Sequence, residues 1–238
     1  MIFFDNDVFK LSKNLNVTTI NYGLTDISIL DNFYDDLDAV NCEIEKLPIT
    51  LVGGLYKPDN GKKYIDGRKT YIQNMRGTEL PYLVNDQLKK VVSEITKVDL
   101  SNIEVNEKLL INCFKELVNF PKKTHYYSAH RDTFNHSNQV SQLAIVVFLN
   151  KFYEDGEGIN FYDFPKKDWN EYKEKPFIRK DELDVKYFLQ AKPNRAVLFD
   201  SLIYHGQVNF SDQFVNELRL TQVIFFPIFS RKNKVFNW

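Results

Sequence analysis

Apolar residues recur at helical spacing in two segments of the first half of the chain, within residues 33–47 and 84–95. Asp31 and Asn32 stand directly before the first segment, where an N-cap is expected. Just upstream, the short apolar run 27–30 predicts a strand. We therefore predict that residues 1–109 form a mixed, partly helical region that supports the rest of the chain.

The second half of the chain consists of short apolar runs separated by turn signals. These runs are rich in Val, Ile and Phe and have the length of strands. They cover residues 111–118, 142–149, 159–164, 195–199 and 218–226. Strands in series predict a sandwich or barrel, so we expect an α+β protein with its β core in residues 110–227.

Residues 164–190 interrupt the strands with a long polar stretch, which we interpret as an insertion or lid. A second polar stretch, 53–76, lies between the predicted helices, and we expect both stretches to form a substrate entrance. Gly156 and Gly158 precede the first stretch and predict a hairpin turn. A length of 238 residues suits a single domain, residues 1–238.

Composition narrows the function classes. The 20 Phe and 13 Tyr favour strands around an aromatic core, and a net charge of −1 disfavours a globally basic nucleic-acid binder while leaving room for a local patch. Cys42 and Cys113 lie far apart and form no metal-binding pair, so we expect two buried free thiols. The chain shows no membrane-spanning run and no leader, which predicts a cytoplasmic protein without a membrane partner.

The chain has only four histidines, and one of them belongs to the motif His130-Arg131-Asp132. Residues two apart on a strand face the same side, so His130 and Asp132 can bind one ion. His205, which follows a predicted strand, is the candidate third ligand. Two His and one carboxylate leave positions open on Fe(II). The alternative is a structural His beside an Asp.

Arg219 and Thr221 share one face of the last predicted strand, and that face continues through Val223 and Phe225. An Arg directed into an apolar barrel needs an anionic partner. A guanidinium and a hydroxyl together suit a carboxylate at the far end of a ligand. The alternative is a structural Arg paired with Glu217 or Asp212.

The order of these motifs resembles the Fe(II)- and 2-oxoglutarate-dependent dioxygenases, in particular the prolyl-4-hydroxylase-like branch. The resemblance covers residues 110–227 well and 27–100 loosely. It is carried by the segments HYYSAHRDT (125–133), QLAIVVFLNKFYEDGEGINFYDF (142–164), KPNRAVLFDSLIYHGQ (192–207) and LRLTQVIFF (218–226).

The resemblance implies a double-stranded β-helix, of the jelly-roll or cupin type, with supporting N-terminal helices. It implies that His130, Asp132 and His205 bind Fe(II), that Arg219 binds the 5-carboxylate of 2-oxoglutarate, and that Thr221 assists. Dioxygen is the other cosubstrate, with ascorbate as a candidate reductant.

The chain departs from the family pattern at one cosubstrate position. The family often has a Tyr about ten residues before the first ligand, where this chain has Phe120. Tyr127 is the candidate substitute, and Gln142 is a second polar candidate to face 2-oxoglutarate. His125 and His136 flank the motif and are expected to be loop residues.

The expected activity is hydroxylation of a C–H bond, because a carboxylate stands where a halogenase would have Gly or Ala. The substrate class stays open among peptidyl, amino-acid, small-molecule and nucleobase groups, and so does the choice between monomer and homodimer.

One alternative is a non-catalytic jelly-roll binding or structural module, against which the complete triad argues. The other is a cupin-like metalloenzyme that does not use 2-oxoglutarate, against which Arg219 and Thr221 argue.

Overall fold

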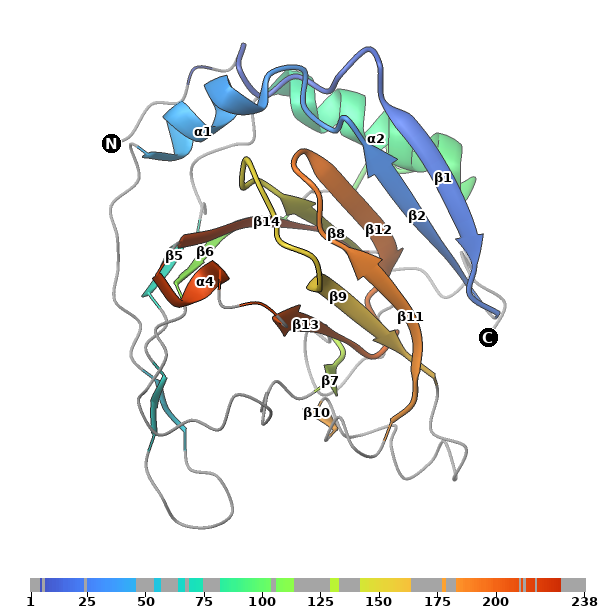
Figure 1. Cartoon of the computed structure of the whole chain (residues 1–238). Coiled ribbons are helices and arrows are strands. Elements are labelled where there is room, and N and C mark those ends of the chain that lie inside the picture. The colour runs from blue at the N-terminus through green and yellow to red at the C-terminus, as the bar shows by residue number, and fades with distance from the viewer. Residues whose placement is uncertain are drawn as a thin grey trace.

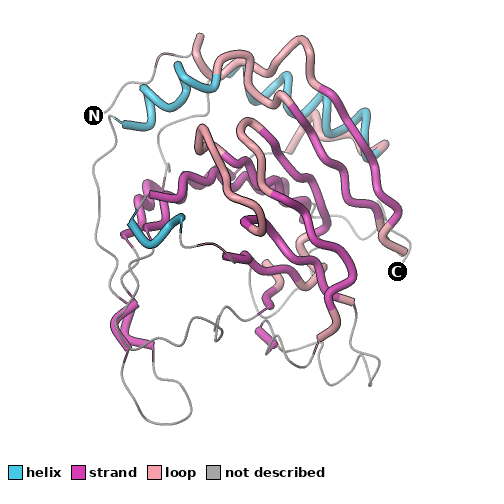
Figure 2. Tube along the Cα trace, in the orientation of Figure 1, coloured by secondary structure: helices cyan, strands magenta, loops and turns pink. Residues whose placement is uncertain are grey.

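The structure is a computed structural model of the whole chain. It describes residues 5, 7–23, 25–45, 54–56, 64–66, 69–74, 82–103, 106–113, 129–132, 142–163, 177–178, 183–209, 211, 213–216 and 218–227. Figures 1 and 2 draw these residues as ribbon and tube. They form two main antiparallel sheets with helices on one side, which is a jelly-roll-like arrangement.

The larger sheet has seven strands and the smaller has five. In spatial order, the larger sheet consists of β1 (Asn16–Asn21), β2 (Asp26–Asp31), β12 (Arg195–Asp200), β8 (Gln142–Phe148), β14 (Leu218–Pro227), β6 (Asn106–Cys113) and β5 (Lys69–Asn74). The smaller sheet consists of β10 (Phe177–Ile178), β7 (Ala129–His130), β13 (His205–Asn209), β9 (Glu157–Tyr162) and β11 (Val185–Gln190). A separate pair consists of β3 (Gly54–Tyr56) and β4 (Tyr64–Asp66).

The described helices are α1 (Leu37–Glu45), α2 (Tyr82–Thr96) and the short α4 (Gln213–Asn216). Figure 1 shows α1 and α2 along one side of the larger sheet and the smaller sheet on the other. The central strands are therefore buried on both faces, which explains why they are continuous apolar runs rather than alternating ones. None of the helices in the described part of the chain has the length and apolar character to cross a membrane.

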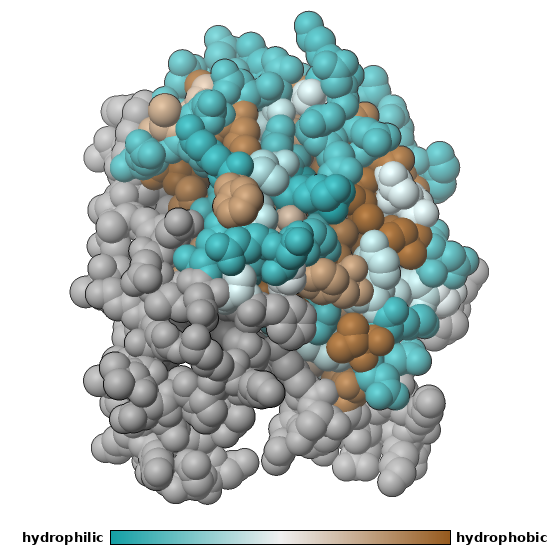
Figure 3. All heavy atoms as spheres, in the orientation of Figure 1, coloured by the Kyte–Doolittle hydropathy of each residue, from teal (hydrophilic) through white to brown (hydrophobic). Residues whose placement is uncertain are grey.

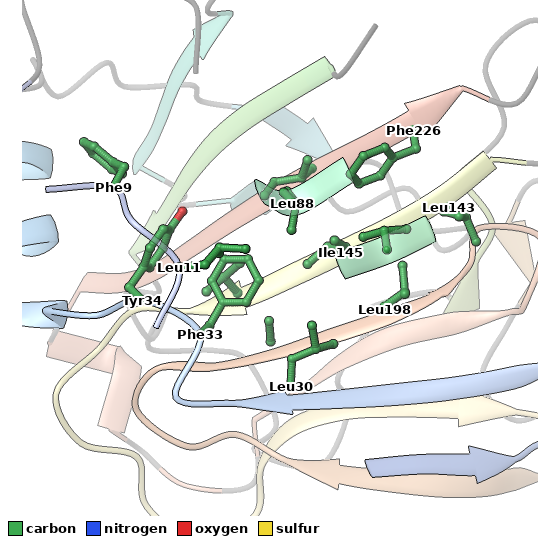
Figure 4. Close-up of a cluster of buried hydrophobic side chains, with 14 of the residues drawn as sticks. Phe9, Leu11, Leu30, Phe33, Tyr34, Leu88, Leu143, Ile145, Leu198 and Phe226 are labelled. Carbon is green, nitrogen blue, oxygen red and sulfur yellow. The ribbon is translucent and has the colours of Figure 1, made fainter. Parts of the chain in front are cut away.

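Alternate residues of the central strands build two apolar clusters. On the helix side, Leu143, Ile145, Leu198 and Phe226 pack with residues of α1, α2 and the N-terminal segment. Figure 4 shows this cluster, with Leu88 of α2 over the strands and Phe33 and Tyr34 at one end. The residues between them along the strands face the smaller sheet and form the second cluster, which includes Phe148, Phe199, Phe225, Ile159 and Phe161.

The strand predictions are confirmed for residues 27–30, 195–199 and 218–226, which fall on β2, β12 and β14. They are also confirmed for most of 142–149 and 159–164, where β8 ends at Phe148 and β9 at Tyr162, and residue 164 lies outside the described residues. Within the run 111–118, residues 111–113 lie on β6, which begins earlier, at Asn106, and residues 114–118 lie outside the described residues. The predicted insertion 164–190 is wrong at its C-terminal end, because Val185–Gln190 is β11 and pairs with β9. Most of the rest of that stretch, and most of 53–76, lies outside the described residues.

The start of the first helix also differs from the prediction. The helix α1 begins at Leu37, and the Asp36 carboxylate accepts a hydrogen bond from the Ala39 N–H at 3.0 Å, so Asp36 is the N-cap. Asp31 instead ends β2, where it accepts hydrogen bonds from Arg195 at 2.6 and 2.9 Å. Phe33 and Tyr34 are buried core residues before the helix. Their spacing from Leu37 is the spacing expected within a helix, which is why the sequence predicted an earlier start.

Two further predictions from single residues need correction. Cys42 is an exposed thiol on α1, not a buried one, and the Cys113 side chain lies outside the described residues. Gly156 lies in a turn with φ +89°, but that turn connects β8 of one sheet to β9 of the other and is not a hairpin. Gly158 lies within β9, where a Cβ would be 2.0 Å from the Leu189 carbonyl oxygen. Only glycine allows β11 to approach so closely.

The described surface mixes polar and apolar residues. Figure 3 shows hydrophilic and hydrophobic residues interspersed over the described part of one face. Among the described residues, the large apolar side chains that are exposed are Val17, Phe152 and Val185. These three come from separate elements, and single exposed apolar residues are normal on a protein surface.

Candidate metal centre

The two histidines and the aspartate of the predicted triad meet at one end of the smaller sheet. His130 on β7 and His205 on β13 are direct partners in the antiparallel register. Asp132 follows β7, and its N–H donates to the Ser201 carbonyl oxygen at 3.0 Å, which fixes the chain beyond the short strand. The potential ligand atoms of the three residues lie within 4.8 Å of one another.

The His205 ring is held by a backbone hydrogen bond at Nδ1. Nδ1 lies 2.8 Å from the Ile203 carbonyl oxygen. Because a carbonyl oxygen can only accept, Nδ1 carries a proton, which leaves Nε2 as the nitrogen that can bind a metal. Nε2 lies 3.3 Å from the Asp132 carboxylate, on the side where a metal would bind. A backbone acceptor behind the imidazole is the usual support of a metal-ligating histidine.

The site is closed on one side and open on the other. The His205 side chain is 6% exposed, whereas His130 is 35% and Asp132 22% exposed. The ring of Phe199 lies 4.6 Å from that of His205, centre to centre. The Nε2 of His130 lies 3.7 Å from the Asp132 carboxylate. Two imidazoles and one carboxylate with open access fit an Fe(II) ion that keeps positions for other ligands.

Arg131 lies between the two ligands in sequence but is directed away from them. Its guanidinium lies 4.9 Å from the centre of the Tyr204 ring, and Tyr204 directly precedes His205. Arg131 is 5% exposed and Tyr204 1% exposed. Burial lowers the pKa of Arg131 from its usual range. The contact links the residue next to His130 with the residue next to His205, which the sequence analysis did not foresee.

Arg219 and Thr221 lie on the face of β14 that is directed toward the smaller sheet. The guanidinium of Arg219, only 2% exposed, lies 5.8 Å from the centre of the Phe214 ring and 3.5 Å from the Gly158 carbonyl oxygen of β9. Thr221 is also buried and pairs with Phe148 of β8. The same face continues into Val223 and Phe225, as predicted from the alternation.

Glu157 is a buried acid beside Arg219 that the sequence analysis missed. It is 0% exposed, and its Oε1 accepts hydrogen bonds from the Ser211 N–H and hydroxyl at 3.1 and 2.6 Å. Burial raises the pKa of Glu157, while the Ser211 hydrogen bonds and the Arg219 charge act in the opposite direction. A signal existed, because Glu157 alternates with Ile159 and Phe161, which mark the buried face of β9.

His205 and Arg219 both contact the apolar cluster between the two sheets. Phe161 and Phe199, which lie against His205, belong to the apolar cluster that also contains Phe214, the residue beneath Arg219. The walls between the two groups are apolar, so charged groups there are poorly solvated. A polar ligand in this region would depend on the few polar side chains present.

The structure does not describe the side chains of several predicted site residues. Tyr127, Phe120, His125 and His136 lie outside the described residues, as do Asp212 and Glu217, the alternative partners of Arg219. Gln142 is the first residue of β8 and pairs with Pro227, at the opposite end of the strand from Phe148 and Thr221. Its side chain is not among those described.

Comparisons with known proteins find structures but no related sequences. No family model and no curated protein matches the chain. A solved structure of EvdO2 from Micromonospora carbonacea var. aurantiaca matches with a TM-score of 0.53 at 13% identity, over 94% of this chain and 99% of that one. EvdO2 in complex with 2-oxoglutarate matches with a TM-score of 0.50 at 13% identity, over 94% and 100%.

Two other neighbours have lower overall similarity. A Burkholderia pseudomallei oxidoreductase of the 2OG-Fe(II) oxygenase family has a TM-score of 0.46 at 12% identity, over 80% of this chain and 77% of that one. A Pseudomonas putida prolyl-4-hydroxylase has a TM-score of 0.43 at 13% identity, over 84% of each chain. The structural neighbours thus include members of the superfamily and branch that the motifs resemble. At these identities the likeness concerns the fold.

Proposed function

We propose that the chain is an Fe(II)- and 2-oxoglutarate-dependent oxygenase that hydroxylates a C–H bond. The observation that carries the proposal is the meeting of His130, Asp132 and His205 with their ligand atoms within 4.8 Å. On this proposal the two sheets form a double-stranded β-helix, in which β7 and β13 present the metal ligands. The fold shared with EvdO2, which was solved with 2-oxoglutarate, supports the choice of cosubstrate.

Each triad residue has a defined role in this proposal. His130 and His205 would bind the metal through imidazole nitrogens, and Asp132 would add a carboxylate oxygen and the only negative charge of the set. The Ile203 carbonyl oxygen holds the His205 ring in the tautomer that a metal requires. When bound, iron, 2-oxoglutarate and dioxygen together would supply the oxidant for the C–H bond, with succinate and CO₂ as coproducts.

Arg219 would anchor the distal carboxylate of 2-oxoglutarate. A guanidinium binds a carboxylate through two parallel hydrogen bonds, and its burial against Phe214 removes competing water. The Thr221 hydroxyl, two residues along the same face, would donate a further hydrogen bond. Tyr127 and Gln142 remain candidates for additional contacts, and the apolar walls at Phe161 and Phe199 would keep the region dry.

The metal site is tested by binding, independently of activity. We expect the full chain to bind one Fe(II) or Mn(II), and Asp132→Ala or His205→Ala to weaken binding by about 100-fold or more, because a ligand is lost. Asp155→Ala, at an exposed carboxylate in the turn before β9, is the matched control and should bind metal as the wild type does. Stoichiometric Fe(II) binding by the double variant Asp132→Ala, His205→Ala would overturn the assignment.

Succinate formation then separates the proposed reaction from its alternatives. The iron-loaded protein should convert 2-oxoglutarate to succinate slowly even without its substrate, and Asp132→Ala should not. A screen of peptides and metabolites for a mass gain of one oxygen, coupled to succinate, would identify the substrate. Metal binding without any 2-oxoglutarate binding or turnover would leave a cupin-like metalloprotein that does not use this cosubstrate.

A further inference from the structure

Glu157 is a carboxylate enclosed by the protein at the cosubstrate end of the proposed site. It begins β9 and is paired with Asn209, four positions along the strand from the pair formed by Phe161 and His205. It is therefore separate from the metal ligands. Fully buried acids are rare unless they are paired or functional. The proposed function assigns no role to this one.

The surroundings of Glu157 satisfy one of its two oxygens. Oε1 accepts both hydrogen bonds from Ser211. Oε2 is buried and has no hydrogen-bond partner among the described residues. The described charged or titratable groups that act on Glu157 are Arg219 from β14, and Tyr153 and Glu154 from the segment before β9. Arg219 is the only one of these with a positive charge.

We propose that the Glu157 carboxylate takes up a proton, at Oε2, when the distal carboxylate of 2-oxoglutarate binds Arg219. This inference rests on the proposed function, because it presumes that 2-oxoglutarate is the ligand of Arg219. The step is a proton transfer from solvent to the Glu157 carboxylate, so no electrons change hands and no co-reactant is needed.

The physical argument is that the charge of one guanidinium would act on two carboxylates. In the free protein, burial raises the pKa of Glu157, while the Ser211 hydrogen bond and then the Arg219 charge act to lower it. The Arg219 guanidinium lies 3.5 Å from the carbonyl oxygen of Gly158, the residue that follows Glu157. A second carboxylate at Arg219 would compete for that charge and repel Glu157. Two carboxylates at one site do not both remain charged easily, and the pKa of one of them rises. The distal carboxyl of 2-oxoglutarate is about as acidic as a Glu side chain, but it would hold the two parallel hydrogen bonds from Arg219. Glu157 is fully buried and its Oε2 has no hydrogen-bond partner among the described residues, so the proton goes to Glu157.

The sign of the pH effect follows from this linkage. The pKa of Glu157 is already above its usual range in the free protein, because of burial, and ligand binding raises it further. Below the free-protein pKa, Glu157 is protonated beforehand and binding is at its tightest. As the pH rises between the two pKa values, binding must take up a proton and the affinity for 2-oxoglutarate falls, by up to about tenfold per pH unit.

Calorimetric titration of the Mn(II)-loaded full chain with 2-oxoglutarate measures both affinity and proton uptake. Titrations run in two buffers of different ionisation enthalpy, from about pH 6 to about pH 8.5. The wild type should take up a fraction of a proton and lose affinity toward high pH. Glu157→Gln should take up correspondingly less and bind about tenfold tighter at the upper end of the range, because the repelling charge is gone.

Glu154→Gln is the matched control, since this exposed carboxylate lies three residues away and acts only weakly on Glu157. It should behave as the wild type does. If the wild type binds 2-oxoglutarate but Glu157→Gln has the same affinity and the same proton uptake, the role of Glu157 is overturned while the proposed function stands. If the wild type binds no 2-oxoglutarate, the proposed function itself fails.

Ser211→Ala keeps the proposal testable should Glu157→Gln not fold. It removes the hydroxyl that donates to Oε1 at 2.6 Å, and so should raise the pKa of Glu157 further. Proton uptake should then shift to higher pH, and the affinity for 2-oxoglutarate near neutral pH should increase. Unchanged proton uptake in Ser211→Ala would contradict the proposal.

Discussion

Arg219 is a charged side chain that is almost completely buried. Its charge lies against an aromatic ring and a carbonyl oxygen in a region that water reaches poorly. In such surroundings a bidentate contact to a carboxylate is strong, and the shape of the donor matters as well as its charge. Substitution of Arg219 is therefore the most direct test of 2-oxoglutarate as the proposed cosubstrate.

We predict that Arg219→Ala lowers the affinity for 2-oxoglutarate by about 30- to 5,000-fold, corresponding to about 2–5 kcal/mol for truncating one partner of such a pair. Arg219→Lys should recover only part of the loss, because a point charge does not reproduce the guanidinium fork. Calorimetry on the Mn(II)-loaded variants measures this, with metal affinity as the internal control. Unchanged affinity in Arg219→Ala would mean that another cation holds the carboxylate.

Among the elements, β2 and β12 connect the N-terminal region to the core. They are neighbours in the larger sheet, and Arg195 of β12 donates to both carboxylate oxygens of Asp31, the last residue of β2, at 2.6 and 2.9 Å. The hydrogen bond from Arg195 is the main reason why the pKa of Asp31 is lowered. This ion pair fixes the end of β2 before the chain turns toward α1.

We predict that Asp31→Asn lowers the free energy of unfolding at neutral pH by about 1 kcal/mol, a modest value because Asp31 is partly exposed. A lowered folded-state pKa contributes stability above the ordinary Asp pKa of about 3.9, and that stability is lost as the pH falls through the folded-state value. The difference between the variant and the wild type should therefore disappear toward low pH. Urea denaturation at several pH values tests this, with Asp26→Asn, at the exposed start of the same strand, as control.

At the scale of the whole molecule, the helix-side cluster joins the two halves of the chain. Residues from the N-terminal segment, α1 and α2 pack on the outward face of β8, β12 and β14. The region that the sequence assigned to a supporting role is thus half of a shared core. The other face of the same strands carries Arg219 and the apolar walls of the site. The N-terminal region and Arg219 of the candidate site therefore lie on opposite faces of the larger sheet.

We predict that residues 110–238 do not fold alone, because removal of residues 1–109 leaves buried residues such as Leu143, Ile145 and Leu198 facing water. The fragment should lack a cooperative thermal transition and bind no metal tightly, as measured by circular dichroism and metal titration. Co-expression with residues 1–109 is the control and should restore both. A fragment that melts cooperatively and binds metal would show that the first half is dispensable.

The sequence by itself determined the features that depend only on residues close together along the chain. A strand places residues i and i+2 on one face, so the alternation alone assigns Arg219 and Thr221 to a common face, and the same rule picks out His130 and Asp132 as a pair. Continuous apolar runs marked β8 and β12 because these strands are buried on both sides. Local sequence is enough for such statements.

The tertiary structure alone decided which of these faces meet. Glu157 lies near Arg219, 62 residues away along the chain, because the first residues of β9 and of β14 lie close together, and no local pattern encodes that. The packing of Arg131 on the Tyr204 ring is another contact that no local pattern predicts. The same is true of the hydrogen bond between Arg195 and Asp31, which was expected to be an N-cap, and of the exposure of Cys42. Strand pairing and register join residues that are distant in sequence. The energy that selects one register comes from the whole core, so it is not written in any single segment.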